Sequence, residues 1–585
     1  MLSRGLASVV LVVGLLPFLG TTANAQPSFR TVAVTGEQAP GLAAGTTFIG
    51  FSRMSISAGG DAAFLGMIEG PGVLNGAFGN GVWHEPAGGP LAFVAQQRGL
   101  VPIIGGTAQI ESFGVYPPVH NAQGDVLFFA TLRQGGGIGF GNARGLWRTA
   151  PGSFTTLVVR EGDATTGVDD ETTFSFMEST PLLNASGQSA FTALTRNPGG
   201  SGGGMWRAEP NGGLVPLVTT GTAVPGESAG VAFALPKYVN HTPINAAGDV
   251  LFVGSIAGVG IDSTNNLGIW AVGADGSIDE IAREGDPAPG IAGVFGDFGA
   301  PTHNTAGDVV GLCVLTGAGV SSENDTGIWV LRDDRAPAPI ALEGDQVPGL
   351  PGGLVFAEFN SPRLNELGCI VFRARVAGPG VDESNEWGVW SVQPNGAAAI
   401  LVRSSDAAPG FPAGAWFDTV GTPVLGASGA IVFTGTVAGP GVAPDTRGVW
   451  MSRGRGSPAL LVREGTQIQS IGPDGSVRAF DVTDVTFLAQ VDQDGGPRSV
   501  SAQDEVLVGL GFGSFPSLDN GVFVISSEPC NPADLNADGV LNVDDIEAFV
   551  TAFLSADLAA DCDANTVLNV DDIECFVAAF LAGCG

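Results

Sequence analysis

Short apolar stretches alternate with glycine-rich polar turns along most of the chain. The stretches are rich in Val, Ile and Phe, and almost none has a helical period, so they are typical of β-strands. A triplet of glycine, an apolar residue and an aromatic residue marks a repeat of about 60 residues. It occurs at Gly81-Val82-Trp83, Gly145-Leu146-Trp147, Gly204-Met205-Trp206, Gly268-Ile269-Trp270, Gly327-Ile328-Trp329, Gly388-Val389-Trp390, Gly448-Val449-Trp450 and Gly521-Val522-Phe523.

Two turns recur in these units, one of the Glu284–Gly290 kind and one of the Asn245–Asp249 kind. Four short strands per unit, separated by such turns, are typical of a β-propeller. We therefore predict a mainly β protein with an eight-bladed propeller. Seven blades are the alternative, because the last interval, from Gly448 to Gly521, is irregular at 73 residues. A linear array of β-sandwiches is less consistent with the pattern, since a sandwich usually takes about 100 residues.

The two ends of the repeat region complement each other. The last unit stops after Phe523 without its closing strand, and Thr31–Val34 matches the closing strand of the other units. The N-terminal strand is therefore predicted to complete the last unit and close the ring. The recurring tryptophan is predicted to pack in the core and not to form a sugar-stacking platform, because it stands once per unit at a fixed place in a strand.

The pattern changes to a helical period after residue 528. Two apolar stripes at helical spacing predict two short helices that bury their stripes against each other. The stripes are Ile546, Phe549, Val550, Phe553 and Leu554, and Ile573, Phe576, Val577, Phe580 and Leu581.

Composition adds a constraint on binding partners. The 24 basic and 58 acidic residues give a net charge of −34, which repels nucleic acids and anionic membranes. Twelve acidic residues and no basic residue lie between 528 and 585. The chain is thus not expected to bind nucleic acid, and its tail is expected to attract cations.

The tail contains two stretches with the spacing of a calcium loop. Oxygen side chains at loop positions 1, 3, 5, 9 and 12, with a carbonyl at position 7, can surround a calcium ion. The predicted ligands are Asp534, Asn536, Asp538, Val540, Asn542 and Asp545 in the first loop, and Asp561, Asp563, Asn565, Val567, Asn569 and Asp572 in the second. Gly539 suits the sharp turn at position 6, whereas Thr566 is strained there, so the second Ca²⁺ site is expected to be weaker. Calcium binding should be coupled to folding of the tail.

These residues resemble a type I dockerin. Each loop ends in Asp and is followed by one helix, and Cys530 and Cys584 frame the pair in a way that is similar to the GC-type variant of secreted bacterial proteins. The resemblance implies a module at 528–585 and a cohesin-like or cell-surface attachment protein as partner. Val543-Asp544 and Val570-Asp571, with no basic residue on the helices, depart from the residues that bind cellulosomal cohesins, so general attachment is the expected role. The repeat region also resembles uncharacterised tandem-repeat proteins that carry this tail.

The first residues predict export. Arg4, the apolar run Val9–Leu19 and Ala23-Asn24-Ala25 are typical of a secretory signal peptide at 1–25, with the propeller at 26–527. The run is too short to span a membrane. In an oxidising compartment the pairings 530–584 and 562–575 are our preferred hypothesis among three connectivities, and Cys313 and Cys369 are expected to be buried free thiols.

Signals for catalysis are weak. His84, His120, His241 and His303 lie in different units with no ligand-like spacing. The GxSxG match around Ser228 lacks the strand and helix that such a nucleophile needs. The pair Asp169-Asp170 would need another carboxylate across a cleft to hydrolyse a glycoside.

Two functions remain open. The favoured one is a secreted, non-catalytic binding or display protein, tethered through the calcium-dependent tail. The alternative is an extracellular carbohydrate-active protein, either polysaccharide-binding or hydrolysing O-glycosyl bonds. Ligand contacts on the propeller, to a polysaccharide or a protein, are expected in loops such as Asp262–Asn266, Ser322–Asp325 and Asp382–Glu386, although these also fit solvated hairpins.

Overall fold

The computed structural model describes two compact units, Pro27–Ser527 and a unit that includes Glu528–Gly585. In the first unit the described residues are 27–73, 78–168, 171–177, 180, 182–236, 244–332, 336–394, 398–443, 446–453, 457–471, 475–487, 495–512 and 519–526. In the second they are 533, 535, 543–554, 560, 562 and 568–582. The predicted signal peptide lies outside the described residues. Among the helices of these ranges, none has the length and apolar character needed to cross a membrane.

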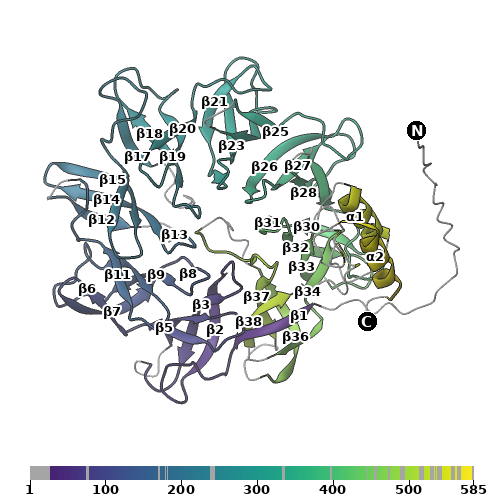
Figure 1. The fold of residues 1–585 in the computed structure, drawn as a ribbon, viewed down its shortest axis with the longest axis horizontal. Helices are drawn as coiled ribbons and strands as arrows, with labels where there is room; N and C mark the ends of the chain where they lie inside the picture. The colour runs from purple at the N-terminus through teal and green to yellow at the C-terminus, as the bar shows by residue number, and fades with distance from the viewer. Residues whose placement is uncertain are drawn as a thin grey trace, which may run out of the picture. The chain divides into compact units, whose positions relative to one another are not determined.

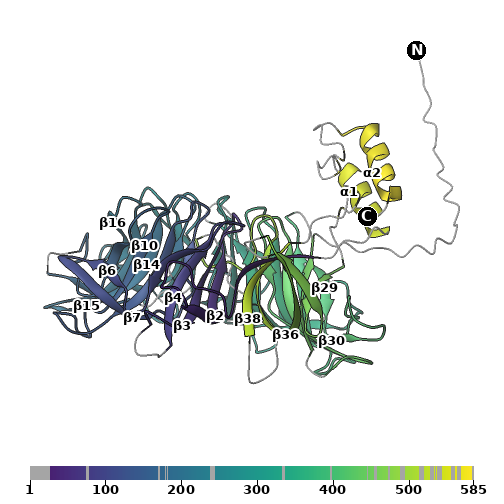
Figure 2. The same ribbon diagram turned by 90° about the horizontal axis from the view of Figure 1, so that it is seen from below.

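The first unit is a β-propeller with seven blades, and its sheets follow one another around a ring (Figure 1). Each blade is an open antiparallel sheet whose strands stand side by side, as β2, β3 and β4 do in Figure 2. The first three blades consist of β2 (Thr47–Ile56), β3 (Ala62–Glu69), β4 (Gly79–Glu85) and β5 (Ala92–Gln96); β6 (Leu100–Ile103), β7 (Gly106–Phe113), β8 (Val119–His120), β9 (Val126–Leu132), β10 (Arg144–Thr149) and β11 (Thr156–Arg160); and β12 (Thr173–Met177), β13 (Leu182–Leu183), β14 (Ser189–Asn197), β15 (Gly200–Ala208) and β16 (Leu214–Thr219).

The other four blades have the same design. They consist of β17 (Ala232–Pro236), β18 (Val250–Ala257), β19 (Leu267–Val272) and β20 (Ile278–Arg283); β21 (Val294–Phe298), β22 (Thr302–His303), β23 (Val309–Thr316), β24 (Thr326–Leu331) and β25 (Ala338–Leu342); β26 (Val355–Leu364), β27 (Ile370–Ala377), β28 (Trp387–Val392) and β29 (Ala399–Arg403); and β30 (Trp416–Val420), β31 (Val424–Leu425), β32 (Ile431–Ala438), β33 (Thr446–Ser452) and β34 (Ala459–Arg463).

The eighth repeat forms a closed sheet with the N-terminal strand. Its strands are β1 (Ser28–Val34), β35 (Gln467–Ile471), β36 (Val477–Thr486), β37 (Val506–Phe512) and β38 (Asp519–Ser526). β1 pairs antiparallel with β38, which confirms that the N-terminal strand completes the last unit. β1 also pairs in parallel with β35, so both of its edges are used. The prediction of eight blades is therefore wrong and the alternative of seven holds, because the eighth repeat closes on itself and leaves no open sheet.

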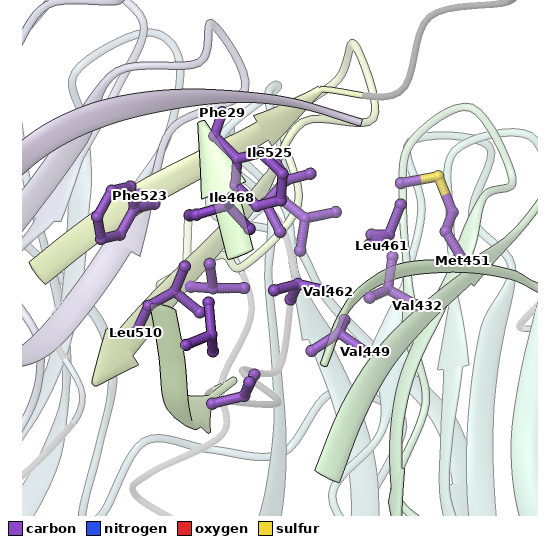
Figure 3. Close-up of a cluster of buried hydrophobic side chains, with 14 of the residues drawn as sticks. Phe29, Val432, Val449, Met451, Leu461, Val462, Ile468, Leu510, Phe523 and Ile525 are labelled. Atoms are coloured by element: carbon purple, nitrogen blue, oxygen red, sulfur yellow. The ribbon is translucent and has the colours of Figure 1, made fainter. Parts of the chain in front are cut away.

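The closed sheet lies between the first and seventh blades (Figure 1) and shares a core with the seventh. Its apolar side chains meet those of β32, β33 and β34 in one cluster, and Figure 3 shows this contact. The labelled side chains of this cluster are Phe29, Val432, Val449, Met451, Leu461, Val462, Ile468, Leu510, Phe523 and Ile525. The ring is thus closed by burial as well as by strand pairing.

In six of the seven blades the indole of the recurring triplet lies over the glycine of the same triplet, and in the third a Cβ on Gly204 would meet Val218 and Thr219 first. A Cβ on Gly81 would lie 2.5 Å from Cη2 of Trp83, because residues two apart share a face of the strand and the indole folds over the glycine. Trp83 Nε1 donates to the Pro40 carbonyl at 3.1 Å, so this hydrogen bond joins the triplet to the turn that opens the repeat. All seven triplet tryptophans are buried, which confirms their predicted place in the core.

The second recurring turn joins neighbouring blades toward the middle of the ring. Asn184 Oδ1 accepts from the Gln188 amide at 2.9 Å, and its Nδ2 donates to the Asn245 carbonyl of the next blade at 3.0 Å. The same link connects Asn121 to Asn184, at 3.3 Å. One asparagine therefore shapes its own turn and also fastens it to the following blade.

The extra length of the last interval reaches the propeller axis. The Gly495 carbonyl accepts from the Leu183 amide at 2.6 Å, and the Arg498 carbonyl accepts from the Ile56 amide at 2.9 Å. A Cβ on Gly495 would lie 2.3 Å from Cγ2 of Ile244. The axial segment, residues 495–500, thus contacts the first and third blades and the turn before β18 in the fourth.

The second unit contains two helices that lie side by side, α1 (Val543–Leu554) and α2 (Val570–Ala582) (Figures 1 and 2). Phe549 and Phe576 are buried between them with ring centroids 4.1 Å apart, so the two predicted helices are confirmed. The prediction that the whole stripes bury each other is wrong, because only one side of each stripe meets the other helix. Between 38% and 47% of the surface of each of four stripe residues is exposed, namely Ile546, Val550, Ile573 and Val577.

The cysteines agree with the sequence where they are described. Cys562 and Cys575 form a disulfide, as predicted. Cys313 and Cys369 are buried and free, also as predicted. Cys530 and Cys584 lie outside the described residues, so their pairing stays a prediction.

Candidate functional site

Two buried carboxylates mark a candidate metal centre in the second unit. Asp545 and Asp572 stand at position 12 of the two predicted loops and are fully buried, near the starts of α1 and α2. Asp572 Oδ2 accepts from the Asn569 amide at 2.8 Å, which caps α2 and fixes the direction of the carboxylate. Buried carboxylates need charged or hydrogen-bonding partners, and bidentate oxygen at position 12 is the ligand that a calcium loop requires.

Three of the twelve predicted ligands lie in the described part of the tail, namely Asp545, Asn569 and Asp572. The other nine lie outside it: Asp534, Asn536, Asp538, Val540, Asn542, Asp561, Asp563, Asn565 and Val567. Within the described ranges, no group of three or more His, Cys, Asp or Glu side chains is arranged to hold a metal ion. Asp545 belongs to the first loop and Asn569 and Asp572 to the second, and carboxylate and amide oxygens are the kinds of ligand that a hard cation such as Ca²⁺ takes.

The histidines are less scattered than their sequence positions indicate. The rings of His84 and His120 lie 5.3 Å apart across the first and second blades, and Asp61 Oδ2 lies 3.6 Å from His84 Nε2. His120 Nε2 donates to the Asp61 carbonyl at 2.7 Å. Burial, and then the nearby His84, lowers the pKa of His120 to about 4. Aligning the repeats could have found this cluster, because Asp61 ends a recurring turn and His84 follows a triplet tryptophan.

Ser55 beside this cluster is not a catalytic serine. Its Oγ donates to the Pro118 carbonyl at 2.5 Å and lies 3.2 Å from His120 Nδ1. The Asp61 carboxylate faces His84 instead of His120, and Ser55 is buried. The group therefore forms a polar contact between two blades and not a nucleophile, base and orienting acid in series.

The axis of the propeller contains a small cavity of about 80 Å³. It is lined by alanines and asparagines of the recurring turns together with His120, Leu183, Gly495, Gly496 and Arg498. No carboxylate and no Phe, Tyr or Trp side chain occurs among these lining residues. Ligand pockets usually start at about 300 Å³, so the axial cavity is too small for a sugar ring.

The other candidates from the sequence are accounted for by local structure. Ser228 lies in an exposed turn, where its carbonyl accepts from the Val231 amide at 3.0 Å. In the hairpin loops, Asp262 accepts from the amide and hydroxyl of Thr264, and Asp382 accepts from those of Ser384. These loops satisfy their own polar groups, which explains their residues without a ligand. His241 and the pair Asp169-Asp170 lie outside the described residues.

The fold and these sites define a β-propeller protein with one of its own segments at the axis. The chain belongs to the Family of unknown function (DUF7453), whose model matches residues 19–137 and 98–527. No curated protein matches the chain.

Solved structures with some similarity include the Dos1 propeller, with 9% identity over 77% of this chain and 88% of that chain and a TM-score of 0.32. Prolyl oligopeptidase B from Galerina marginata has 12% identity over 74% of this chain and 54% of that chain, with a TM-score of 0.36. A polysaccharide lyase, an ulvan lyase, has 10% identity over 70% of this chain and 90% of that chain, with a TM-score of 0.29. Likeness at this level carries no argument about function.

Proposed function

We propose that the protein is a secreted, non-catalytic binding or display protein, tethered to an extracellular or cell-surface partner through a calcium-dependent, dockerin-like tail. The observation that carries this proposal is the burial of Asp545 and Asp572 at equivalent places in two loop–helix repeats. A unit this small gains little from its core, in which Phe549 and Phe576 are the only large buried side chains among the described residues. Two bound Ca²⁺ ions would offset the charge of the carboxylates and stabilise the helix pair.

The surface of the helix pair supports attachment. Ile546 and Val550 on α1 and Ile573 and Val577 on α2 are exposed at matching positions of the two repeats. Apolar side chains in adjacent turns of a helix form a continuous patch, which is the kind of surface that a protein partner covers. A cohesin-like or cell-surface attachment protein would fit this role.

Hydrolysis of O-glycosyl bonds, the catalytic form of the carbohydrate-active alternative, requires an acidic, aromatic-lined pocket built from residues that do not repeat. The described lining of the axial cavity consists instead of small residues, amides, one leucine, one histidine and one arginine. The position of Ser228 in a turn gives no support to an esterase-like activity either. The binding or display role is therefore the better supported reading of the propeller.

Calcium titration of the metal-free full chain tests the proposal. Calorimetry should report two bound Ca²⁺ ions in the wild type. Asp534→Ala should abolish the tighter event and Asp561→Ala only the weaker one, because Thr566 weakens the second loop. Asp382→Ala, which removes an exposed loop carboxylate of the propeller, is the matched control and should leave both events unchanged. Absence of binding in the wild type would contradict the metal assignment.

Attachment is tested separately with the full chain. The wild type should be retained on the surface of the producing cells in calcium and released by a chelator. Val550→Glu together with Val577→Glu should bind calcium normally and fail to attach, since both charges fall on the exposed patch. Retention of this double variant would show that the partner uses another surface.

A further inference from the structure

The third blade differs from its neighbours at the hairpin between its second and third strands. β14 and β15 are joined by Pro198 and Gly199 alone, and Asn197 pairs with Gly200 across the turn. In the other blades this connection is longer, and in the second, fourth, fifth and sixth it packs on the turn that follows the sheet. In the fourth blade, for example, a Cβ on Gly285 would lie 3.3 Å from the Thr264 carbonyl, whereas a Cβ on the equivalent Gly221 of the third blade would have nothing within 4 Å.

The place of the missing loop is a groove of about 300 Å³. Its lining includes the glycine-rich start of β15 and, on the neighbouring strand, the end of β16 with the turn after it. The lining residues are Val168, Thr172, Thr195, Asn197, Gly199, Gly200, Ser201, Gly202, Gly203, Thr219 and Thr220. We call this the third-blade groove.

Thr195 at the floor of the groove is exceptional for its position. In the third blade the triplet tryptophan, Trp206, pairs with Phe191, and Thr195 comes four residues after Phe191. The residue at this position in each of the six other blades is apolar and buried. These residues are Ile68, Leu132, Ile256, Leu315, Val376 and Val437. Thr195 is 6% exposed, and its backbone pairs with Phe174 and Gly202 in the neighbouring strands. Its hydroxyl, which can both donate and accept a hydrogen bond, borders the groove where the other blades have only carbon.

A second hydroxyl lies beside it. A Cβ on Gly202 would lie 3.3 Å from Thr195 Oγ1 and 3.4 Å from Thr220 Oγ1, so both oxygens border the space above this glycine. Thr220 Oγ1 already bonds to the Gly203 amide and carbonyl. At the equivalent place the fourth blade has Glu284, which binds the Leu267 amide. The third blade thus has a neutral group where its groove opens, as the first and sixth blades do with Gln97 and Ser404.

We propose that the third-blade groove binds a neutral sugar unit. The described lining residues include no charged side chain, so they offer neither an anion nor a cation a counter-charge, and the net charge of −34 further disfavours anions. Threonine, serine and asparagine side chains both donate and accept hydrogen bonds, which matches the hydroxyl groups of a sugar. Glycines let the backbone approach the ligand closely. A volume near the lower limit of ligand pockets limits the bound part to one or two rings.

This inference rests on the binding role proposed for the propeller and not on the tail. Saturation-transfer NMR of the full chain with glucose, galactose, mannose, xylose and arabinose tests it, with glucuronate as the charged comparison. At least one neutral sugar should show transfer, equally in calcium and in chelator, and glucuronate should show none. If the chain still binds calcium but no neutral sugar shows transfer, the proposal of a sugar site in the groove is wrong, whereas the proposal of a calcium-dependent tether is unaffected.

Two variants locate the site. Thr195→Val restores the apolar character of the other blades, so it should fold at least as stably as the wild type and bind the sugar at least tenfold more weakly. Gly202→Val fills the space between the two hydroxyls and should abolish binding. Thr316→Val, on the fifth blade, is the matched control and should bind normally. Unchanged binding by both groove variants would overturn the assignment.

Discussion

Trp390 and Trp450 provide a comparison in which one hydrogen bond is the main difference. Both indoles are fully buried, and each stacks on the phenylalanine opposite it at an interplanar angle of 12°. Trp450 Nε1 donates to the Pro409 carbonyl at 3.0 Å, whereas Trp390 Nε1 is buried without a partner in the described part of the chain. Replacing each by phenylalanine removes the same atoms, although Phe411 also stacks on Trp450, with ring centroids 5.9 Å apart, and the sixth blade has Leu350 at the equivalent position. The cost of the cavity should therefore be similar in the two variants.

The lost polar group changes the free energy of unfolding in opposite directions in the two variants. Trp450→Phe leaves the Pro409 carbonyl without its donor, at a cost of about 1–3 kcal/mol. Trp390→Phe removes a buried N–H that already lacks a partner, and so removes a penalty of about the same size. We expect Trp450→Phe to be less stable than Trp390→Phe by about 2 kcal/mol or more.

Calorimetry can resolve this difference. If all of the roughly 500 residues of Pro27–Ser527 unfold together, their unfolding entropy is about 1 kcal/mol/K, so the two Tm values should differ by about 2 °C. If blades unfold in smaller groups, as in other repeat proteins, the difference should be larger. Near-ultraviolet circular dichroism would verify that both variants keep the packed ring. Equal Tm values, or a lower Tm for Trp390→Phe, would refute the role given to the bond with Pro409.

Two further predictions concern acid stability and the axial segment. Burial lowers the pKa of His303 to about 4 against the opposing effect of the Asp249 and Glu366 carboxylates, so the native state loses stability as the pH falls from about 6.5 toward 4. His303→Leu, which introduces the residue found at this place in other blades, should raise Tm more at pH 4.5 than at pH 7.5; an equal rise at both would contradict the assignment. Gly495→Ala should destabilise the ring by about 1–3 kcal/mol more than Gly475→Ala in urea unfolding. Both glycines have positive φ, +79° and +77°, but only Gly495 has a close neighbour, so equal losses would show that the axial segment does not hold the blades.

The strands and core of a blade could be predicted from the sequence, but the way in which the ring closes could not. The contact between Gly81 and Trp83 is local to one strand, so its spacing survives as a repeated motif that can be read without a structure. Closure depends on β1 meeting β35 and β38, more than 400 residues away in the chain. Only the three-dimensional arrangement shows that β1 uses both edges, and this second pairing reduced the eight predicted blades to seven.

The candidate sites were predictable to different degrees for a similar reason. The calcium spacing is contiguous, so position 12 could be assigned to Asp545 and Asp572 before their burial was known. The meeting of Asp61, His84 and His120 depends on the register between two blades, which spacing along the chain does not report. The helical stripes showed which residues are apolar, but a period of 3.6 does not determine which half of a stripe the partner helix covers.

Departures from a repeat carry information that the repeat itself does not. The short hairpin after Asn197 and Thr195 in place of an apolar residue are both visible in the sequence once the units are aligned, and both lie around one groove. The unpaired indole of Trp390 has no such signature, because Pro348 occupies the same motif position as Pro409. A motif thus specifies which groups are available to bond in each blade, whereas the packing of that blade decides whether they reach each other.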